Sequence, residues 1–119
     1  MEKLINATTD ILRKGAEFEL EYATRFSDKI VEIGRKLPGG SEIDFVLKGD
    51  VFVNVKNYDW SKSFYKTDFG INQVIEEFLG QVNIYKQYST EVKYVFKGSV
   101  LGIVRKALED AGVIVEVVP

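Results

Sequence analysis

Two short alternating segments separated by a Gly-Asp pair constrain the fold of this chain most strongly. Apolar residues occupy every second position in IDFVL (43–47) and again in VFVNV (51–55). Such alternation is typical of half-buried β-strands, and Gly49-Asp50 can adopt the backbone of a tight hairpin turn. Residues 41–58 therefore predict a hairpin in which Ile43, Phe45 and Leu47 share one face.

The remaining segments alternate between helical and strand-like patterns. Apolar residues at helical spacing cover 9–27, 71–88 and 100–112, whereas apolar runs at 30–33, 91–98 and 113–118 indicate strands, the last of them buried. The order is α-β-β-β-α-β-α-β, without a repeat, linker or low-complexity segment. We predict one α/β domain over residues 1–119, with a mixed central sheet flanked by helices.

The chain contains no Cys and no His, which excludes disulfides, thiolate or imidazole metal sites and a Ser-His-Asp triad. Catalysis would have to use carboxylates, Lys, Tyr, hydroxyls, amides, or a hard cation held by oxygen ligands. The N-terminal segment has no apolar signal-peptide core, and no apolar run approaches the roughly 20 residues of a transmembrane helix. We expect a cytoplasmic site of action.

Three polar side chains of the hairpin are predicted to lie opposite its apolar face. Alternation puts Asp44 there on the first arm, and Asn54 and Lys56 on the second. A carboxylate and an amide oxygen close together can hold Mg²⁺ or Mn²⁺, and a neighbouring ammonium can stabilise charge on a phosphate. The alternative is a polar face that meets only water, as most such strand faces do.

The chain resembles the PD-(D/E)xK nuclease superfamily over roughly residues 15–95, with Asp44 in the second strand and Lys56 at the end of the third. The resemblance implies a restriction-endonuclease-like fold and metal-dependent hydrolysis of phosphodiester bonds. On the first helix, Gly15 and Glu19 match the spacing of a family glycine and a metal-binding glutamate. Glu17 and Glu21 are nearby alternatives, and a solvated acidic helix face would have the same appearance.

The helix predicted after the hairpin carries Gln81 and Tyr85. Side chains at i and i+4 lie on one face of a helix, and the Q-x-x-x-Y spacing resembles the RecB-type branch of the superfamily. The resemblance implies that Gln81 contacts Lys56 or the phosphate backbone and that Tyr85 hydrogen-bonds or stacks. A surface Gln beside a core Tyr would give the same spacing.

Asn54 departs from the family pattern, in which an acid stands two residues before the lysine. An asparagine binds a hard cation through its amide oxygen without formal charge, so affinity should fall. Three explanations stay open. The chain is a natural variant that recruits its acid from Glu19, Glu42 or Asp50, or an engineered inactive sequence, or a fold kept for binding after catalysis was lost.

The resemblance also implies a role for each site residue. The metal, Mg²⁺ or Mn²⁺, would be held by oxygen atoms of Glu19, Asp44, Asn54 and Val55, the last through its backbone carbonyl. Lys56 would position the attacking water.

The loop after the hairpin, NYDWSKSFYKTDFG (57–70), interleaves aromatic residues with lysines. This pattern suits unstacked bases and phosphates, so we predict substrate contacts from Asn57, Tyr58, Trp60, Lys62 and Lys66. The expected substrate is nucleic acid, with RNA slightly preferred over DNA, in single-stranded, looped or flipped form. The alternative is that at least half of the rings pack as core.

The motif KNYDW and the small size also resemble C-terminal toxin nuclease domains of contact-dependent growth inhibition systems, which implies an immunity protein as partner. Holliday-junction resolvases, which act as dimers, share the Gly-to-Glu first helix but carry basic loops that this chain lacks. A catalytically silent module that binds nucleic acid or a protein through the same cleft is the alternative from another class. Monomer and homodimer both stay open.

Overall fold

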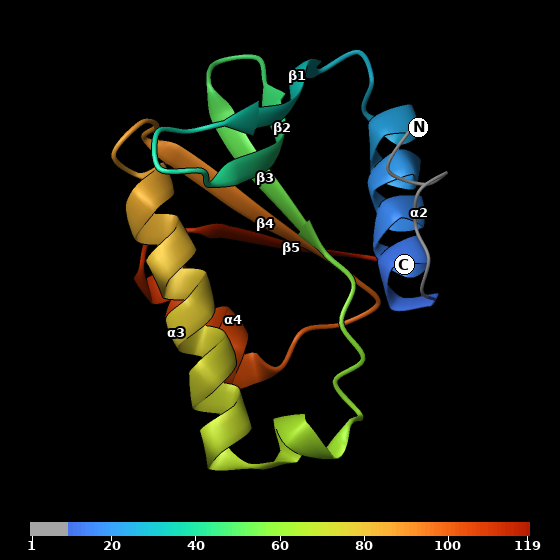
Figure 1. Ribbon diagram of the computed structural model, residues 1–119, viewed down its shortest axis with the longest axis vertical. Helices are drawn as coiled ribbons and strands as arrows, with labels where there is room; N and C mark the ends of the chain where they lie inside the picture. The colour runs from blue at the N-terminus through green and yellow to red at the C-terminus, as the bar shows by residue number, and fades with distance from the viewer. Residues whose placement is uncertain (1–9) are drawn as a thin grey trace.

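The computed structural model describes residues 10–119, with side chains from Glu17 onward. Its elements in chain order (Figure 1) are α2 (Asp10–Arg25), β1 (Ile30–Lys36), β2 (Glu42–Leu47), β3 (Val51–Lys56), the 3₁₀-helix η1 (Ser63–Lys66), α3 (Asp68–Tyr85), β4 (Glu91–Lys97), α4 (Gly102–Asp110) and β5 (Ile114–Val118). The predicted order α-β-β-β-α-β-α-β and the α/β class are confirmed. The predicted start of the first helix, residue 9, lies outside the described residues.

The five strands form one mixed sheet in the order β1-β2-β3-β4-β5. β1, β2 and β3 pair antiparallel, whereas β3, β4 and β5 pair parallel. The turn between β2 and β3 reverses the chain within three residues because Gly49 (φ 86°) and Asp50 (φ 60°) both adopt left-handed backbone conformations. The parallel half needs long crossovers instead, and α3 and α4 provide them.

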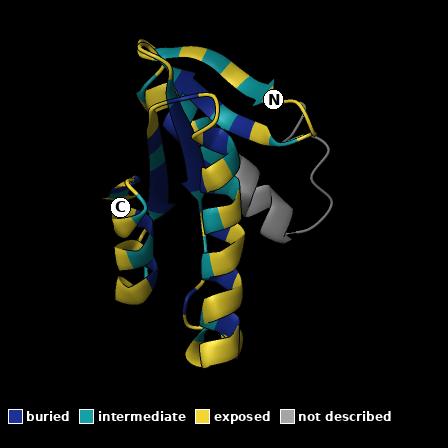
Figure 2. Ribbon diagram, turned by 90° about the vertical axis from the view of Figure 1, so that its left-hand side faces the viewer, coloured by how far each residue is buried: buried dark blue, intermediate teal, exposed yellow. Residues whose placement is uncertain are grey.

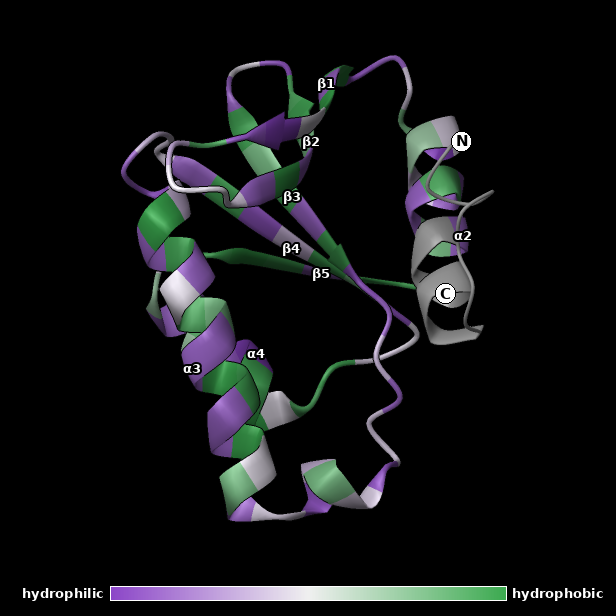
Figure 3. Ribbon diagram, in the orientation of Figure 1, coloured by the Kyte–Doolittle hydropathy of each residue, from purple (hydrophilic) through white to green (hydrophobic). Residues whose placement is uncertain are grey.

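Helices cover both faces of the sheet. α3 and α4 pack on one face, here called the α3 face, against a cluster that includes Phe52, Tyr94 and Phe96. α2 packs on the opposite face, the α2 face, where Val53 and Val95 are buried. Figure 2 shows buried central strands beside helices with exposed outer sides, and Figure 3 shows hydrophobic and hydrophilic residues alternating around α3. No helix within residues 10–119 is long and apolar enough to cross a membrane.

Two features of the parallel half differ from the prediction. α3 begins at Asp68, ahead of the predicted residue 71, because the Thr67 side chain accepts a hydrogen bond from the Gly70 N–H (3.0 Å) and caps the helix. β5 was predicted to be buried, but it is an edge strand with Ile114 and Val117 exposed. That prediction was wrong because an apolar run does not reveal whether a helix covers both faces of its strand.

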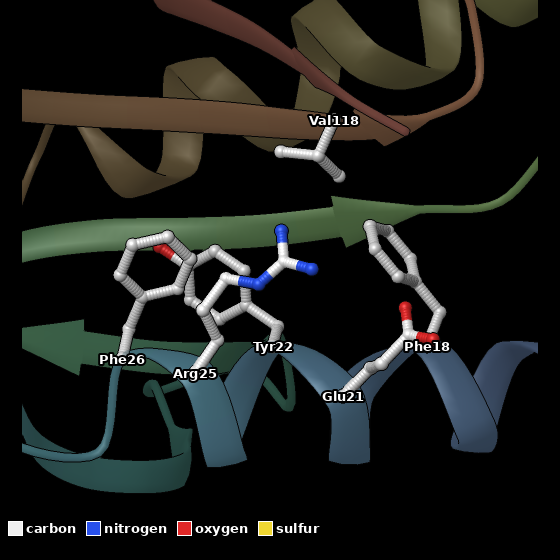
Figure 4. Close-up of a pocket in the computed structure, with 6 residues that line it drawn as sticks. All are labelled: Phe18, Glu21, Tyr22, Arg25, Phe26 and Val118. Atoms are coloured by element: carbon white, nitrogen blue, oxygen red, sulfur yellow. The ribbon is translucent and has the colours of Figure 1, made fainter.

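α2 is attached to the sheet by aromatic packing. Phe18 and Tyr22 are buried, and the Tyr22 ring stacks on Phe45 of β2 at a centroid distance of 5.2 Å. Burial raises the pKa of Tyr22 to about 12. The cavity between α2 and the sheet, which Val118 also lines (Figure 4), has a volume of only about 10 Å³. That is about the space of one water molecule, so α2 is packed here and leaves no room for a ligand.

Candidate active site

The candidate site lies where β2 separates from β3. The β2–β3 pairs run from Leu47–Val51 to Phe45–Val53 and then stop, whereas residues 54–56 of β3 stay paired with β4. Asp44 stands at this point, and its carboxylate accepts a hydrogen bond from the Val55 N–H (Oδ2 to N, 2.9 Å). The Asp44 side chain thus accepts the Val55 N–H beyond the last β2–β3 backbone pair.

Ile43, Phe45 and Leu47 were predicted to share one face of the sheet, and this prediction is wrong for Ile43. Ile43 packs in the cluster of the α3 face, whereas Phe45 belongs to the cluster of the α2 face. The alternation breaks at Asp44, where β2 twists out of its ladder with β3. Because of this twist, the Asp44 carboxylate points at the β3 backbone and is only partly exposed.

Asn54 is buried on the α3 face, with 5% of its surface exposed, and it joins a directional hydrogen-bond chain. The Asn54 amide nitrogen donates to the Tyr85 hydroxyl oxygen (2.9 Å), and that hydroxyl donates to the Glu42 carbonyl (2.9 Å). A phenol has one proton and a carbonyl has none to give, so the amide of Asn54 must present its NH₂ group to Tyr85. Its oxygen Oδ1 therefore faces away from Tyr85.

Lys56 places a poorly hydrated cation at the same end of β3. Its ammonium lies 5.2 Å from the ring centre of Phe78 and 5.7 Å from that of Tyr94. Burial lowers the pKa of Lys56, and the negative charges of Asp44, Glu77 and Glu19 act in the opposite direction. A cation held over aromatic faces and close to several carboxylates is typical of functional sites.

The candidate acids that could replace the missing charge at position 54 differ in where their side chains lie. Glu19 of α2 is close enough to influence Lys56. Glu21 instead pairs with Lys97 (3.5 Å), and Glu17 is exposed. The Glu42 carboxylate extends over Gly34 of β1.

Asp50 lies in the hairpin turn, at the opposite end of β3 from Asn54, so it is not a candidate for the site. Gly15, the other residue of the predicted first-helix motif, lies in the part of α2 for which side-chain surroundings are not described.

The sequence interpretation missed Glu77 on α3. Its charge acts on Lys56 more strongly than that of Glu19. Burial raises the pKa of Tyr58 to about 12, and the charge of Glu77 acts in the same direction. Glu77 precedes Gln81 by one helical turn, so Glu77, Gln81 and Tyr85 form an i, i+4, i+8 series on one helix face. That spacing was the available signal, and only the packing of α3 on the sheet shows which face it serves.

Gln81 and Tyr85 both lie on the side of α3 that meets the sheet, and the side chain of Gln81, which was predicted to contact Lys56 or the phosphate backbone, is hydrogen-bonded to Tyr94. The Gln81 side-chain oxygen accepts a hydrogen bond from the Tyr94 hydroxyl (2.7 Å), whose ring lies under the Lys56 ammonium. Burial and the charge of Asp44 raise the pKa of Tyr85 to about 12, so it keeps the proton that it donates to Glu42. The two side chains thus fix groups around Lys56 and Asn54.

The predicted substrate residues separate into core and surface. Trp60 is buried and donates a hydrogen bond to the Ser99 carbonyl (Nε1 to O, 2.9 Å), so its ring is not a stacking surface. Tyr58 is partly exposed and packs against Trp60 at 5.1 Å. Asn57, Lys62 and Lys66 are exposed.

The donor atoms suit a hard cation in chemical type. Within one strand residue the N–H and C=O point to the same neighbouring strand, so the Val55 carbonyl points, like its N–H, toward Asp44. Carboxylate, amide and carbonyl oxygens together are the ligand types of Mg²⁺ and Mn²⁺. Among the residues with described side chains, no group of three or more His, Cys, Asp or Glu side chains gathers at one place. A cation would therefore depend on neutral oxygens of Asn54 and Val55.

We expect an Asn54→Asp variant to be less stable than the wild type without metal, by about 1–3 kcal/mol. A carboxylate cannot donate to the Tyr85 oxygen, so the phenol proton would turn to residue 54 and leave the Glu42 carbonyl without its donor. Urea denaturation in EDTA measures the loss, and Asn83→Asp on the exposed side of α3 is the control.

The same variant tests whether position 54 faces a cation. With an added negative charge beside Asp44, Mn²⁺ should stabilise Asn54→Asp more than it stabilises the wild type. Equal stability of the two proteins in EDTA would contradict the hydrogen-bond chain. An equal response to Mn²⁺ would contradict cation binding at residue 54.

Comparisons with protein-family models, with curated proteins and with solved structures find no match for this chain.

Proposed function

We propose that this protein is a divalent-metal-dependent phosphodiesterase of the PD-(D/E)xK type that cleaves nucleic acid, RNA in preference to DNA. The observation that carries the proposal is the position of Lys56, a poorly hydrated cation on which the charges of Asp44, Glu77 and Glu19 act where β2 leaves β3. The chain has no His or Cys, and a lysine whose pKa is lowered by burial beside acidic side chains is a group suited to such chemistry.

Each residue has a chemical role in this proposal. Asp44 and Glu19 would hold Mg²⁺ or Mn²⁺ together with the Asn54 amide oxygen and the Val55 carbonyl. A bound cation supplies Lewis-acid polarisation of the phosphate and makes a coordinated water more acidic. The Lys56 ammonium would orient the attacking water and stabilise negative charge on the phosphate. Because the rings of Phe78 and Tyr94 exclude water from below, that attraction is stronger than at an exposed lysine.

The experiment that tests this function is a cleavage assay on total tRNA and plasmid DNA in Mn²⁺, Mg²⁺ or EDTA. We expect metal-dependent cutting that an Asp44→Asn variant loses by at least about 100-fold. Asn is preferred to Ala because its oxygen still accepts the Val55 N–H, whereas Ala would leave that group unpaired at a cost of about 1–3 kcal/mol.

Asp50→Asn is the matched control for this assay. It makes the same chemical change in the same hairpin, at the far end from Lys56 and at a left-handed position that Asn tolerates. Cutting that persists in EDTA, or that Asp44→Asn leaves unchanged, would contradict the proposal.

A catalytically silent nucleic-acid-binding module is the second candidate, and the surroundings of Asn54 favour it. The amide is bound to Tyr85 and adds no charge where the family has an acid. Metal-independent binding of nucleic acid without any cutting would support this module.

A further inference from the structure

The largest exposed aromatic feature among the described residues is a pair of phenylalanines. Phe64 is 45% and Phe69 is 71% exposed, and their rings meet edge to face at a centroid distance of 6.4 Å. They come from η1 and the first turn of α3, at the opposite end of α3 from the β2–β3 hairpin (Figure 1). Contiguous exposed apolar surface of this kind marks an interaction site.

The Phe64–Phe69 pair is held in place by the backbone beneath it. The Thr67 hydroxyl donates to the Phe64 carbonyl (3.0 Å) and accepts from the Gly70 N–H (3.0 Å), which ties η1 to the start of α3. Tyr65, which lies between Phe64 and Thr67 in the chain, packs its ring on Trp60 at a centroid distance of 5.0 Å. A surface fixed in this way loses little conformational entropy when it binds.

Two lysines and two acids flank the pair. Lys62 and Lys66 are exposed, and neither forms an ion pair with another residue whose side chain is described. Asp59 accepts hydrogen bonds from Ser61, and Asp68 lies in the first turn of α3, where the helix dipole offsets its charge. The segment carries two ammonium groups and two carboxylates, so Lys62 and Lys66 offer individual phosphate contacts on a surface with no net charge.

A continuous series of ring contacts joins the pair to Lys56. Phe64 meets Tyr65 at 5.4 Å, Tyr65 meets Tyr58 at 6.0 Å, and Tyr58 meets Phe78 at 5.6 Å. The Lys56 ammonium lies over this last ring. The exposed pair is thus the outer end of an aromatic cluster whose inner end is part of the candidate site.

We propose that Phe64 and Phe69, with Lys62 and Lys66, form a stacking platform for single-stranded nucleic acid that leads the strand to the Lys56 site. Unpaired bases would stack on the rings, and the two ammonium groups would contact phosphates. In a duplex the base faces are stacked on one another and unavailable, so the platform selects against double strands. The inference rests on the proposed function for its ligand class, but its test needs no catalysis.

The test is fluorescence anisotropy of a labelled oligonucleotide of about 12 uridines, titrated with the full chain in EDTA. We expect Phe69→Ala to weaken binding by about 5- to 150-fold, the range for loss of one stacked base. Tyr88→Ala, which removes an exposed aromatic residue just beyond the other end of α3, should leave affinity unchanged. A duplex of equal length should bind more weakly, and replacing Lys62 and Lys66 by Ala should reduce the salt dependence of binding.

The platform would be overturned by absence of oligonucleotide binding by the wild type, by equal losses in the Phe69 and Tyr88 variants, or by equal affinity for the duplex. Sedimentation of the wild type as a dimer that Phe69→Ala converts to a monomer would assign the pair to a second copy of the chain, which also overturns it. If cleavage depends on Asp44 but Phe69→Ala leaves the oligonucleotide affinity unchanged, the platform is rejected and the proposed function stands.

Discussion

A Lys56→Met variant is expected to lose the proposed nuclease activity by about 100- to 1,000-fold and, without metal, to be more stable than the wild type. The activity loss follows because Met has no charge with which to orient water or stabilise a phosphate. Lost function together with a stability gain is the pattern expected of a functional residue that is costly to the fold. Cleavage assays in Mn²⁺ and thermal denaturation in EDTA measure the two effects.

The stability gain follows from the direction of the Lys56 pKa. Burial is the largest influence and lowers the pKa of Lys56, so the charged form is less favourable in the folded protein than in the unfolded chain. Met keeps the apolar stem and can contact the rings of Phe78 and Tyr94 without that cost. We expect a gain of about 1–2 kcal/mol.

Lys97→Met is the matched control. Lys97 also lies over a ring, that of Phe18 at 5.7 Å, but it pairs with Glu21 and its side chain is 36% exposed. We expect little change in its stability and none in cleavage. A Lys56→Met protein that is less stable than the wild type would show that the ammonium supports the fold.

A Gly70→Ala variant is expected to lose about 3 kcal/mol or more of folding free energy. A Cβ atom at residue 70 would lie 1.7 Å from the Phe64 carbonyl oxygen and 2.7 Å from its carbonyl carbon. These are backbone atoms that cannot rotate away as a side chain would, so η1 would have to separate from α3. Chemical denaturation measures the loss.

Gly80→Ala in the same helix is the control for Gly70. No atom lies within 4 Å of a Cβ built there, and the position is exposed. Because Ala favours helices over Gly by about 1 kcal/mol, this variant should be slightly more stable than the wild type. Equal effects at residues 70 and 80 would show that the close approach of η1 to α3 is not rigid.

Since Gly70 supports the Phe64–Phe69 platform, its variant should also bind the oligonucleotide less well.

The β2–β3 hairpin shows which structural features the local sequence predicts and which it does not. β2 and β3 are predictable because alternation and a turn that accepts left-handed residues act within a few positions of the chain. The face taken by Ile43 was not predictable, because it depends on where β2 stops pairing with β3. Asp44 was identified from its position in the chain, but its bond to the Val55 N–H exists only where that ladder ends.

Asn54 and Glu77 show the same limit at the candidate site. The sequence marked Asn54 as a departure from the family pattern, yet the direction of its amide depends on Tyr85, which is 31 residues away along the chain. Glu77 is an exposed helical acid, and only the packing of α3 on the sheet brings its charge to bear on Lys56.

The sequence by itself determined the types and order of the elements and, through the absence of His and Cys, the chemistry that is open to this protein. These properties follow from side-chain periodicity and from composition, which need no knowledge of distant residues. The tertiary structure alone decided which polar groups meet at Lys56 and which aromatic residues stay exposed as Phe64 and Phe69 do. Such contacts depend on strand register and on the packing of helices against the sheet, and residues far apart in the chain determine both.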